Sequence, residues 1–107
     1  MTSRANTLDK LRLFESFYQQ GYQSDVVDQA LDKLVALETA RTQQELADLQ
    51  ARLDTFEQTY QMSSAVFSVR FRDGALGDAA DYFEWSALDD MARSLRQRLQ
   101  ELEAGPA

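Results

Sequence analysis

The sequence contains no cysteine and no histidine among its 107 residues. Their absence excludes zinc fingers, disulfide scaffolds, and haem, iron–sulfur or nucleophilic sites that depend on these two side chains. One proline and four glycines leave few positions that could break a helix. No apolar run approaches the roughly 18 residues of a membrane span, and the polar N-terminus lacks the apolar core of a signal peptide. We therefore expect a cytoplasmic protein that does not bind a membrane.

Basic residues are also scarce, since eleven Lys and Arg stand against eighteen Asp and Glu and the net charge is -7. Clustered Lys and Arg supply most of the affinity for phosphate backbones, so direct nucleic-acid binding is not expected. A negative surface is better suited to a basic partner. The content of hydrophobic residues, 44%, is that of a globular protein. The chain length predicts one helical domain over residues 1–107.

Apolar residues recur with helical spacing, and no segment alternates as a strand would. The pattern predicts four helices, at about residues 7–20, 25–61, 64–73 and 79–103. Side chains that could cap the four N-termini are, in order, Asn6 or Thr7, Ser24, the pair Ser63–Ser64, and Asp78. Gly21 and Gly74 are placed to end the first and third helices.

Two of these helices carry a continuous apolar seam. On the long second helix the seam consists of Leu46, Leu49, Leu53, Phe56 and Tyr60, and on the last helix of Trp85, Leu88, Ala92, Leu95, Leu99 and Leu102. The alternating spacing of three and four residues is typical of coiled-coil-like packing. The predicted fold is therefore all-α: a helical hairpin with one long central helix, a short helix and a C-terminal helix.

Two details of these helices remain open. The polar segment Glu38–Glu45 is interpreted as an exposed part of an unbroken helix, with a bend near Thr39–Gln44 as the alternative. Phe83 and Met91 lie opposite the seam of the last helix, so the start of that helix is expected to be sandwiched.

Half-covered seams would leave much of the available hydrophobic stabilisation unused. Either the C-terminal helix folds back along Leu46–Tyr60, or a second copy or another protein covers the remaining seam, and both can hold. A homodimer or higher oligomer is expected. The residues proposed for self-association are Leu46, Leu49, Leu53, Phe56, Tyr60, Leu88, Leu95, Leu99 and Leu102.

An enzymatic function would have to rest on carboxylates. Acidic pairs three residues apart occur at Asp25/Asp28, Glu45/Asp48, Asp54/Glu57 and Asp81/Glu84. Helical metal sites use such pairs to hold Mg²⁺, but solvated helix faces show the same spacing. We expect no enzyme, with no catalytic residue, no metal ligand and no cofactor, and keep a Mg-dependent helical hydrolase as an alternative.

The segment around the start of the last helix combines acids with aromatic rings. Asp78, Asp81, Tyr82, Glu84 and Trp85 are the candidate partner-binding residues, because aromatic side chains ringed by charge are typical interface anchors. Alternatively, Tyr82, Phe83 and Trp85 belong to the core, and the acids complement the helix dipole.

Residues 50–95 resemble a family of small, acidic, all-helical prokaryotic antitoxin-like proteins of two-gene toxin–antitoxin modules. The matching positions are Phe56-Glu57, Tyr60, Met62-Ser63-Ser64, Phe67, Phe71, Gly74, Leu76-Gly77-Asp78, Asp81-Tyr82-Phe83-Glu84-Trp85, Leu88 and Met91. The chain departs from the pattern at Ala79-Ala80, where relatives carry another acid or polar residue. The resemblance implies a helical fold, a cytoplasmic location and neutralisation of a partner by direct binding, and it supplies no catalytic residue.

The expected function is that of a protein–protein interaction module, an antitoxin that binds a small basic toxin. A structural coiled-coil scaffold or adaptor that forms a homodimer is the second hypothesis.

Overall fold

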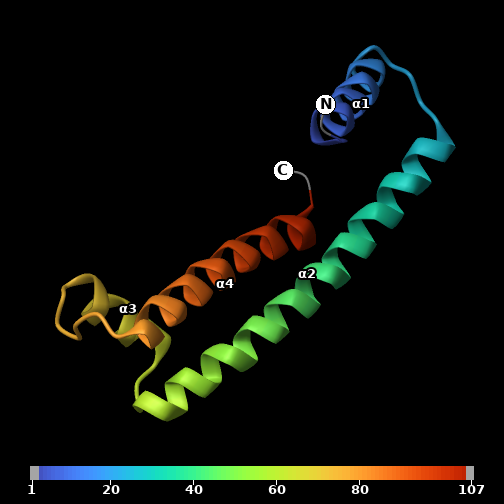
Figure 1. Ribbon diagram of the computed structural model, residues 1–107. Coiled ribbons are helices and arrows are strands. Elements are labelled where there is room, and N and C mark those ends of the chain that lie inside the picture. The colour runs from blue at the N-terminus through green and yellow to red at the C-terminus, as the bar shows by residue number, and fades with distance from the viewer. Residues whose placement is uncertain (1–2, 106–107) are drawn as a thin grey trace. The chain divides into compact units, whose positions relative to one another are not determined.

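The computed structural model describes residues 3–105, which form four helices and no strand (Figure 1). The helices are α1 (Ser3–Gln19), α2 (Asp25–Tyr60), α3 (Ser64–Arg72) and α4 (Ala80–Ala104). The predicted all-α fold is thereby confirmed. Helix α1 begins before Asn6 and Thr7, so these residues lie inside the helix and do not cap it as expected. The sequence before them holds no proline or glycine that would stop the helix from extending.

The chain divides into two units, residues 1–34 and 35–107, and each is described by itself. The expectation of one domain over residues 1–107 stays a prediction, and its first and last two residues lie outside the described part of the chain.

In the second unit α4 runs back along α2, and α3 packs at the end where the two helices are connected (Figure 1). The core consists of Leu49, Leu53, Phe67, Trp85, Leu88, Ala92 and Leu95, with Leu46, Phe56, Tyr60, Met62, Phe71, Leu76 and Tyr82 packed against it. The fold-back alternative is thus confirmed. Most of the residues proposed for self-association therefore pack inside the chain, whereas Leu99 and Leu102 are partly buried outside this core. Self-association through these seams stays a prediction.

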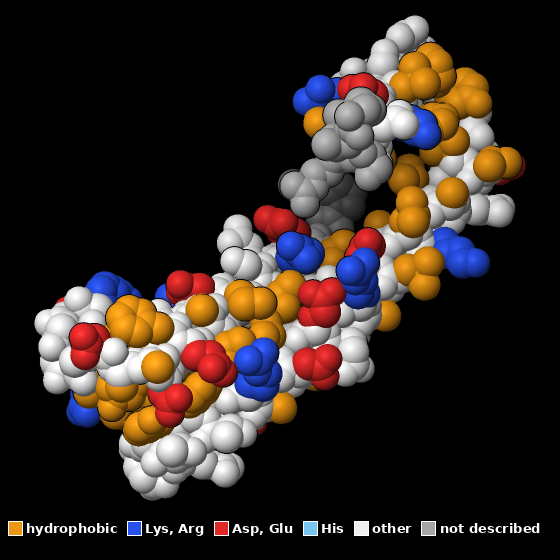
Figure 2. Space-filling model, viewed as in Figure 1, with side chains coloured by type: hydrophobic (Ala, Val, Ile, Leu, Met, Phe, Trp, Pro, Cys, Tyr) orange, Lys and Arg blue, Asp and Glu red, His pale blue; other side chains and the backbone are white. Residues whose placement is uncertain are grey.

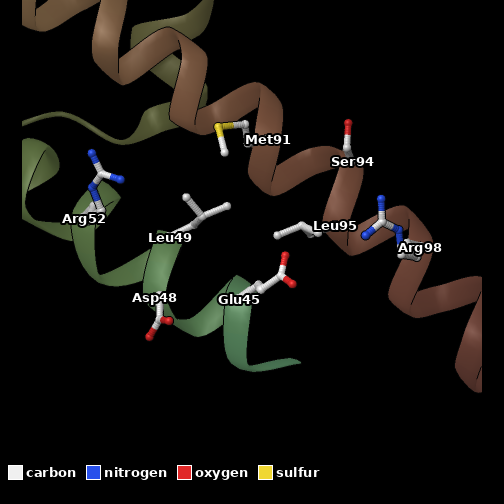
Figure 3. A pocket seen from close by; sticks show the side chains of 8 residues that line it. All are labelled: Glu45, Asp48, Leu49, Arg52, Met91, Ser94, Leu95 and Arg98. Atoms are coloured by element: carbon white, nitrogen blue, oxygen red, sulfur yellow. The ribbon is translucent and has the colours of Figure 1, made fainter. Parts of the chain in front are cut away.

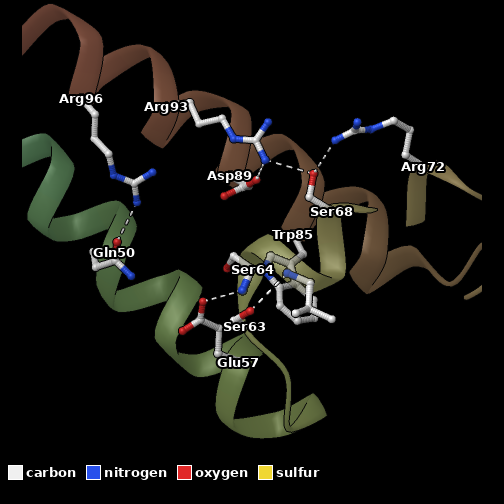
Figure 4. A network of polar contacts seen from close by, with 11 residues as sticks. Gln50, Glu57, Ser63, Ser64, Ser68, Arg72, Trp85, Asp89, Arg93 and Arg96 are labelled. Atoms are coloured by element: carbon white, nitrogen blue, oxygen red, sulfur yellow. Dashed lines mark hydrogen bonds and ion pairs between the residues drawn. The ribbon is translucent and has the colours of Figure 1, made fainter. Parts of the chain in front are cut away.

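Trp85 stands at the centre of this core. Its side chain has no exposed surface. The ring of Phe67, which is equally buried, stacks on it with centroids 3.9 Å apart and an interplanar angle of 4°, and Phe56 stacks at 5.5 Å. The indole Nε1 donates a hydrogen bond of 2.9 Å to the Oγ of Ser64 (Figure 4). In this position the indole ring is packed against apolar rings, and its one polar atom has a hydrogen-bond partner.

The connection between α2 and α3 is closed by two hydrogen bonds. The Oγ of Ser63 accepts from the backbone N–H of Val66 at 3.1 Å, which confirms the predicted cap. The Glu57 carboxylate accepts from the N–H of Ser64 at 2.7 Å (Figure 4). A carboxylate at the N-terminus of a helix also stabilises the positive end of the helix dipole.

Asp78 does not cap α4, in contrast to the prediction. The N-cap is Ala79, which makes no side-chain capping bond. Asp78 stands one residue too early in the chain to occupy the capping position, because the helix starts at Ala80.

The polar segment Glu38–Glu45 lies within the unbroken helix α2, as the favoured interpretation states. Its side chains are mostly exposed, with one clear exception. Thr42 is only 2% exposed, so the expectation of a fully exposed segment is wrong at that position. The neighbouring Gln43 Nε2 donates to the Glu103 carboxylate near the end of α4 at 3.2 Å, which shows that α4 extends to this level of α2.

In the first unit, α1 and the beginning of α2 form a hairpin. The φ angle of Gly21 is 95°, a conformation that glycine adopts most readily, and it ends the turn after α1 as predicted. The Tyr18 hydroxyl donates to the Asp28 carboxylate at 2.7 Å and accepts from the backbone N–H of Ser24 at 3.2 Å. The Ser24 Oγ caps α2 by accepting from the N–H of Val27 at 3.3 Å.

The Trp85–Ser64 hydrogen bond generates the first prediction. In the variant Ser64→Ala the buried indole N–H loses its acceptor, so the free energy of unfolding should fall by about 1–3 kcal/mol. Urea denaturation followed by the fluorescence of Trp85, the single tryptophan, measures the change.

The matched control is Ser94→Ala, an exposed serine of α4. Its unfolding midpoint should differ little from that of the native chain. Equal midpoints for the two variants would show that the hydrogen bond adds nothing to stability.

Candidate functional site

The five candidate partner-binding residues have separate roles in the structure. Trp85 is fully buried and Tyr82 half-buried, with its ring against those of Tyr60 and Phe67. A partner could reach Trp85 only if the core opened, so its assignment as a surface anchor is corrected. Trp85 is buried because it is the first residue of the apolar seam of α4, and this seam faces α2 and α3.

The three candidate acids are exposed, and two of them are held by neighbours. The Asp81 carboxylate accepts a hydrogen bond of 2.5 Å from the Tyr60 hydroxyl. Glu84 forms an ion pair with Arg52 of α2 at 3.4 Å, with more than half of each side chain exposed. Such an exposed pair contributes little to stability, so Glu84 stays available to a charged partner.

Two large apolar side chains of α4 are exposed. Phe83 is 57% exposed and Met91 is 52% exposed. The expectation that the start of α4 is sandwiched is therefore wrong on this side, because α3 covers it only through an edge contact between Phe71 and Phe83 at 5.2 Å.

These two residues lie on one helical face with three exposed neighbours, Glu84, Ala87 and Asp90. We call the five residues Phe83, Glu84, Ala87, Asp90 and Met91 the α4 patch. It combines two large apolar side chains with two carboxylates and contains no base. Exposed aromatic and methionine side chains framed by charge are frequent at protein interfaces.

The α4 patch continues into a groove of about 450 Å³ between α2 and α4 (Figure 3). The groove is lined by Glu45, Asp48, Leu49 and Arg52 of α2 and by Met91, Ser94, Leu95 and Arg98 of α4. Figure 3 shows Met91 beside Leu49, with charged side chains around this apolar floor. A side chain inserted next to Met91 would meet apolar surface below and charges at the rim.

Charge is distributed unevenly along the chain. Residues 1–34 carry four bases and five acids, a net charge of -1, whereas residues 35–107 carry seven bases and thirteen acids, a net charge of -6. The acidic surplus therefore belongs to the unit that contains the α4 patch. A basic partner would be attracted to this unit before contact, an effect that salt weakens.

A polar network joins α3 to α4 on another side of the unit (Figure 4). The buried Asp89 carboxylate accepts from Arg93 at 2.7 Å, and Arg93 also donates to the Ser68 Oγ of α3 at 3.0 Å. The spacing of four residues between Asp89 and Arg93 is typical of an ion pair along one face of a helix. Its burial was not predictable from that spacing, because it depends on the position of α3.

None of the helices formed by residues 3–105 has an apolar stretch long enough to cross a lipid bilayer. Within the same residues, no three acidic side chains come together as a metal ion would require.

Comparison with protein-family models, curated proteins and solved structures finds no match for this chain.

The Tyr60–Asp81 hydrogen bond generates a prediction on pH. The bond to Asp81, with partial burial, raises the pKa of Tyr60 above its ordinary value. Because the folded-state pKa is raised, the bond stabilises the fold fully below about pH 10 and is lost as the pH rises through the folded-state pKa. In Asp81→Ala, one of the four tyrosines should ionise at lower pH, measured by phenolate absorbance.

The control for this titration is Asp78→Ala, which removes an exposed acid three residues away from Asp81. Its phenolate titration should overlay that of the native chain. A curve for Asp81→Ala that also overlays the native one would contradict the assigned cause of the pKa shift.

Proposed function

We propose that this chain is a cytoplasmic protein–protein interaction module, an antitoxin of a two-gene module, which binds a small basic toxin directly. The observation that carries the proposal is the exposure of Phe83 and Met91 on the acidic α4 patch. Burying a large apolar side chain contributes roughly 1.5–3 kcal/mol, so a partner that covers both residues gains affinity from a small area.

The α4 patch suits a basic partner for two reasons. Glu84 and Asp90 flank its apolar residues and can accept charge-assisted hydrogen bonds from Arg or Lys. The net charge of -6 on residues 35–107 adds long-range attraction, which speeds the encounter. Apolar anchors would then set the rate of dissociation, and the carboxylates the rate of association and the choice of partner.

A rigid support lies behind the patch. Phe83 and Met91 alternate along α4 with the buried residues Trp85, Leu88 and Ala92, so the core fixes the helix that presents them. The backbone that carries these anchors is therefore ordered before binding, and little backbone conformational entropy is lost. Neutralisation in this proposal is steric, because the α4 patch covers the basic active surface of the toxin.

The primary test is co-expression with the product of the adjacent open reading frame. We expect that product to arrest growth when expressed alone and to become harmless, and to co-purify, when this chain is present. A product that is harmless alone, or that never co-purifies with this chain, would refute the antitoxin proposal.

Within that complex, the double variant Phe83→Ala/Met91→Ala should weaken binding about 10-fold or more, since truncated interface anchors typically cost above 1 kcal/mol each. Titration calorimetry measures the affinity. The matched control is Val69→Ala, which truncates an exposed apolar residue of α3 in the same unit and should leave the affinity unchanged. Equal affinities for the double variant and the control would move the binding site away from α4.

A further inference from the structure

The hairpin of residues 3–34 has an apolar surface without a core. None of its described side chains, residues 6–34, is buried. Large hydrophobic side chains that are 39–79% exposed occur at Leu8, Leu11, Leu13, Phe14, Phe17, Tyr22, Val26, Leu31 and Leu34. Figure 2 shows hydrophobic side chains on the surface around the α1–α2 connection. Apolar surface concentrated in this way on a small unit marks an interaction site.

The two helices form a groove of about 310 Å³ on this surface. Its lining is apolar apart from Thr7 and Lys10, and consists of Leu11, Phe14, Val26, Val27, Ala30, Leu31 and Leu34. We call these seven apolar residues the hairpin face. The hairpin is well defined despite its missing core, because Tyr18 bonds to Ser24 and Asp28 across the connection.

We propose that two copies of this chain associate through their hairpin faces, so that residues 3–34 of both copies form a four-helix bundle. A single layer of two helices cannot enclose an apolar stripe, whereas two layers packed face to face can. When two identical faces associate about a two-fold axis, both faces are covered, so no further copy can be added at this surface.

The size of the exposed surface fits this partner. With the roughly 200 Å² of an aromatic side chain as an upper value, the exposed parts of Leu11, Phe14, Val26, Leu31 and Leu34 amount to roughly 500 Å² per copy. This is about the apolar share, roughly 65%, of one side of a homodimer interface of standard size. A stable protein–protein interface buries about 800 Å² on each partner. A second hairpin is large enough to cover this surface and brings an equal apolar surface of its own.

Charge favours a second copy over a basic protein at this position. Residues 1–34 have a net charge of only -1, so two hairpins repel each other little. Lys10 at the edge of the groove can meet acids of the other copy, since Asp25, Asp28 and Asp32 follow each other on α2. Residues 35–107, with a net charge of -6, would oppose pairing through that unit.

This inference goes beyond the proposed function, because it concerns other residues and needs no toxin. Most residues of the seams Leu46–Tyr60 and Trp85–Leu102 pack against each other within one chain. In this proposal the surface for self-association is therefore the hairpin face. A dimer would carry two α4 patches.

Sedimentation equilibrium of the full chain between 1 and roughly 100 µM is the first experiment, a range that detects the micromolar affinities of modest interfaces. Two chains of 12.2 kDa give an expected mass of 24.4 kDa. A monomer of 12.2 kDa over the whole range would overturn the proposal and leave the hairpin face to a different protein. A mass above that of the dimer would equally overturn the two-fold bundle.

The double variant Leu11→Glu/Leu31→Glu places a carboxylate on each helix of the hairpin face and should weaken the dimer at least 100-fold, because an unpaired buried charge is strongly unfavourable. Val69→Glu, at an exposed position of α3, is the matched control and should remain dimeric. A dimer of native strength in the double variant would refute the interface.

A cross-linking experiment covers the possibility that the glutamate variant unfolds the hairpin. The chain has no cysteine, so a single introduced thiol reacts alone. Ala30→Cys, within the hairpin face, should give covalent dimers with a short bismaleimide at dilute protein concentration, and Val69→Cys should not. Equal yields for the two variants would refute a specific hairpin interface.

Discussion

The packing of Trp85 is the interaction on which the second unit depends. This one side chain contacts Phe67 of α3 and Phe56 of α2 while it belongs to α4. Its indole nitrogen is paired with Ser64, whose own N–H is held by Glu57. Three helices are therefore connected through one ring and two hydrogen bonds, in a space from which water is excluded. An unpaired indole nitrogen would be costly there, so the hydrogen bond to Ser64 favours this position of α3.

The same packing decides which apolar residues remain on the surface. Since Trp85 and Leu88 face α2 and α3, Phe83 lies on the side of α4 that is turned away from the core, whereas Met91 lies at the groove between α4 and α2. The short helix α3 is too small to cover both sides of α4. The residues that are left uncovered lie among carboxylates, and this combination is what distinguishes the α4 patch from an ordinary exposed hydrophobic residue.

The two units differ in how much of their apolar surface is buried. Residues 35–107 bury their seams within the chain and carry most of the negative charge. Residues 3–34 bury none of their described side chains and are nearly neutral. The chain thus has two chemically distinct surfaces, an acidic one on residues 35–107 and a nearly neutral, apolar one on residues 3–34.

The sequence by itself determined the four helices, because helical periodicity and capping side chains such as Ser24 and Ser63 act between residues close in the chain. It also identified the seams that pair, although it left open whether they pair within the chain. It misplaced the cap at Asp78 and the surface role of Trp85. Only the tertiary structure decided which side of α4 faces α3, and with it the burial of Asp89 and Thr42 and the exposure of Phe83 and Met91. The physical reason is that burial depends on partners distant in sequence, whereas periodicity shows only that a residue lies on an apolar face.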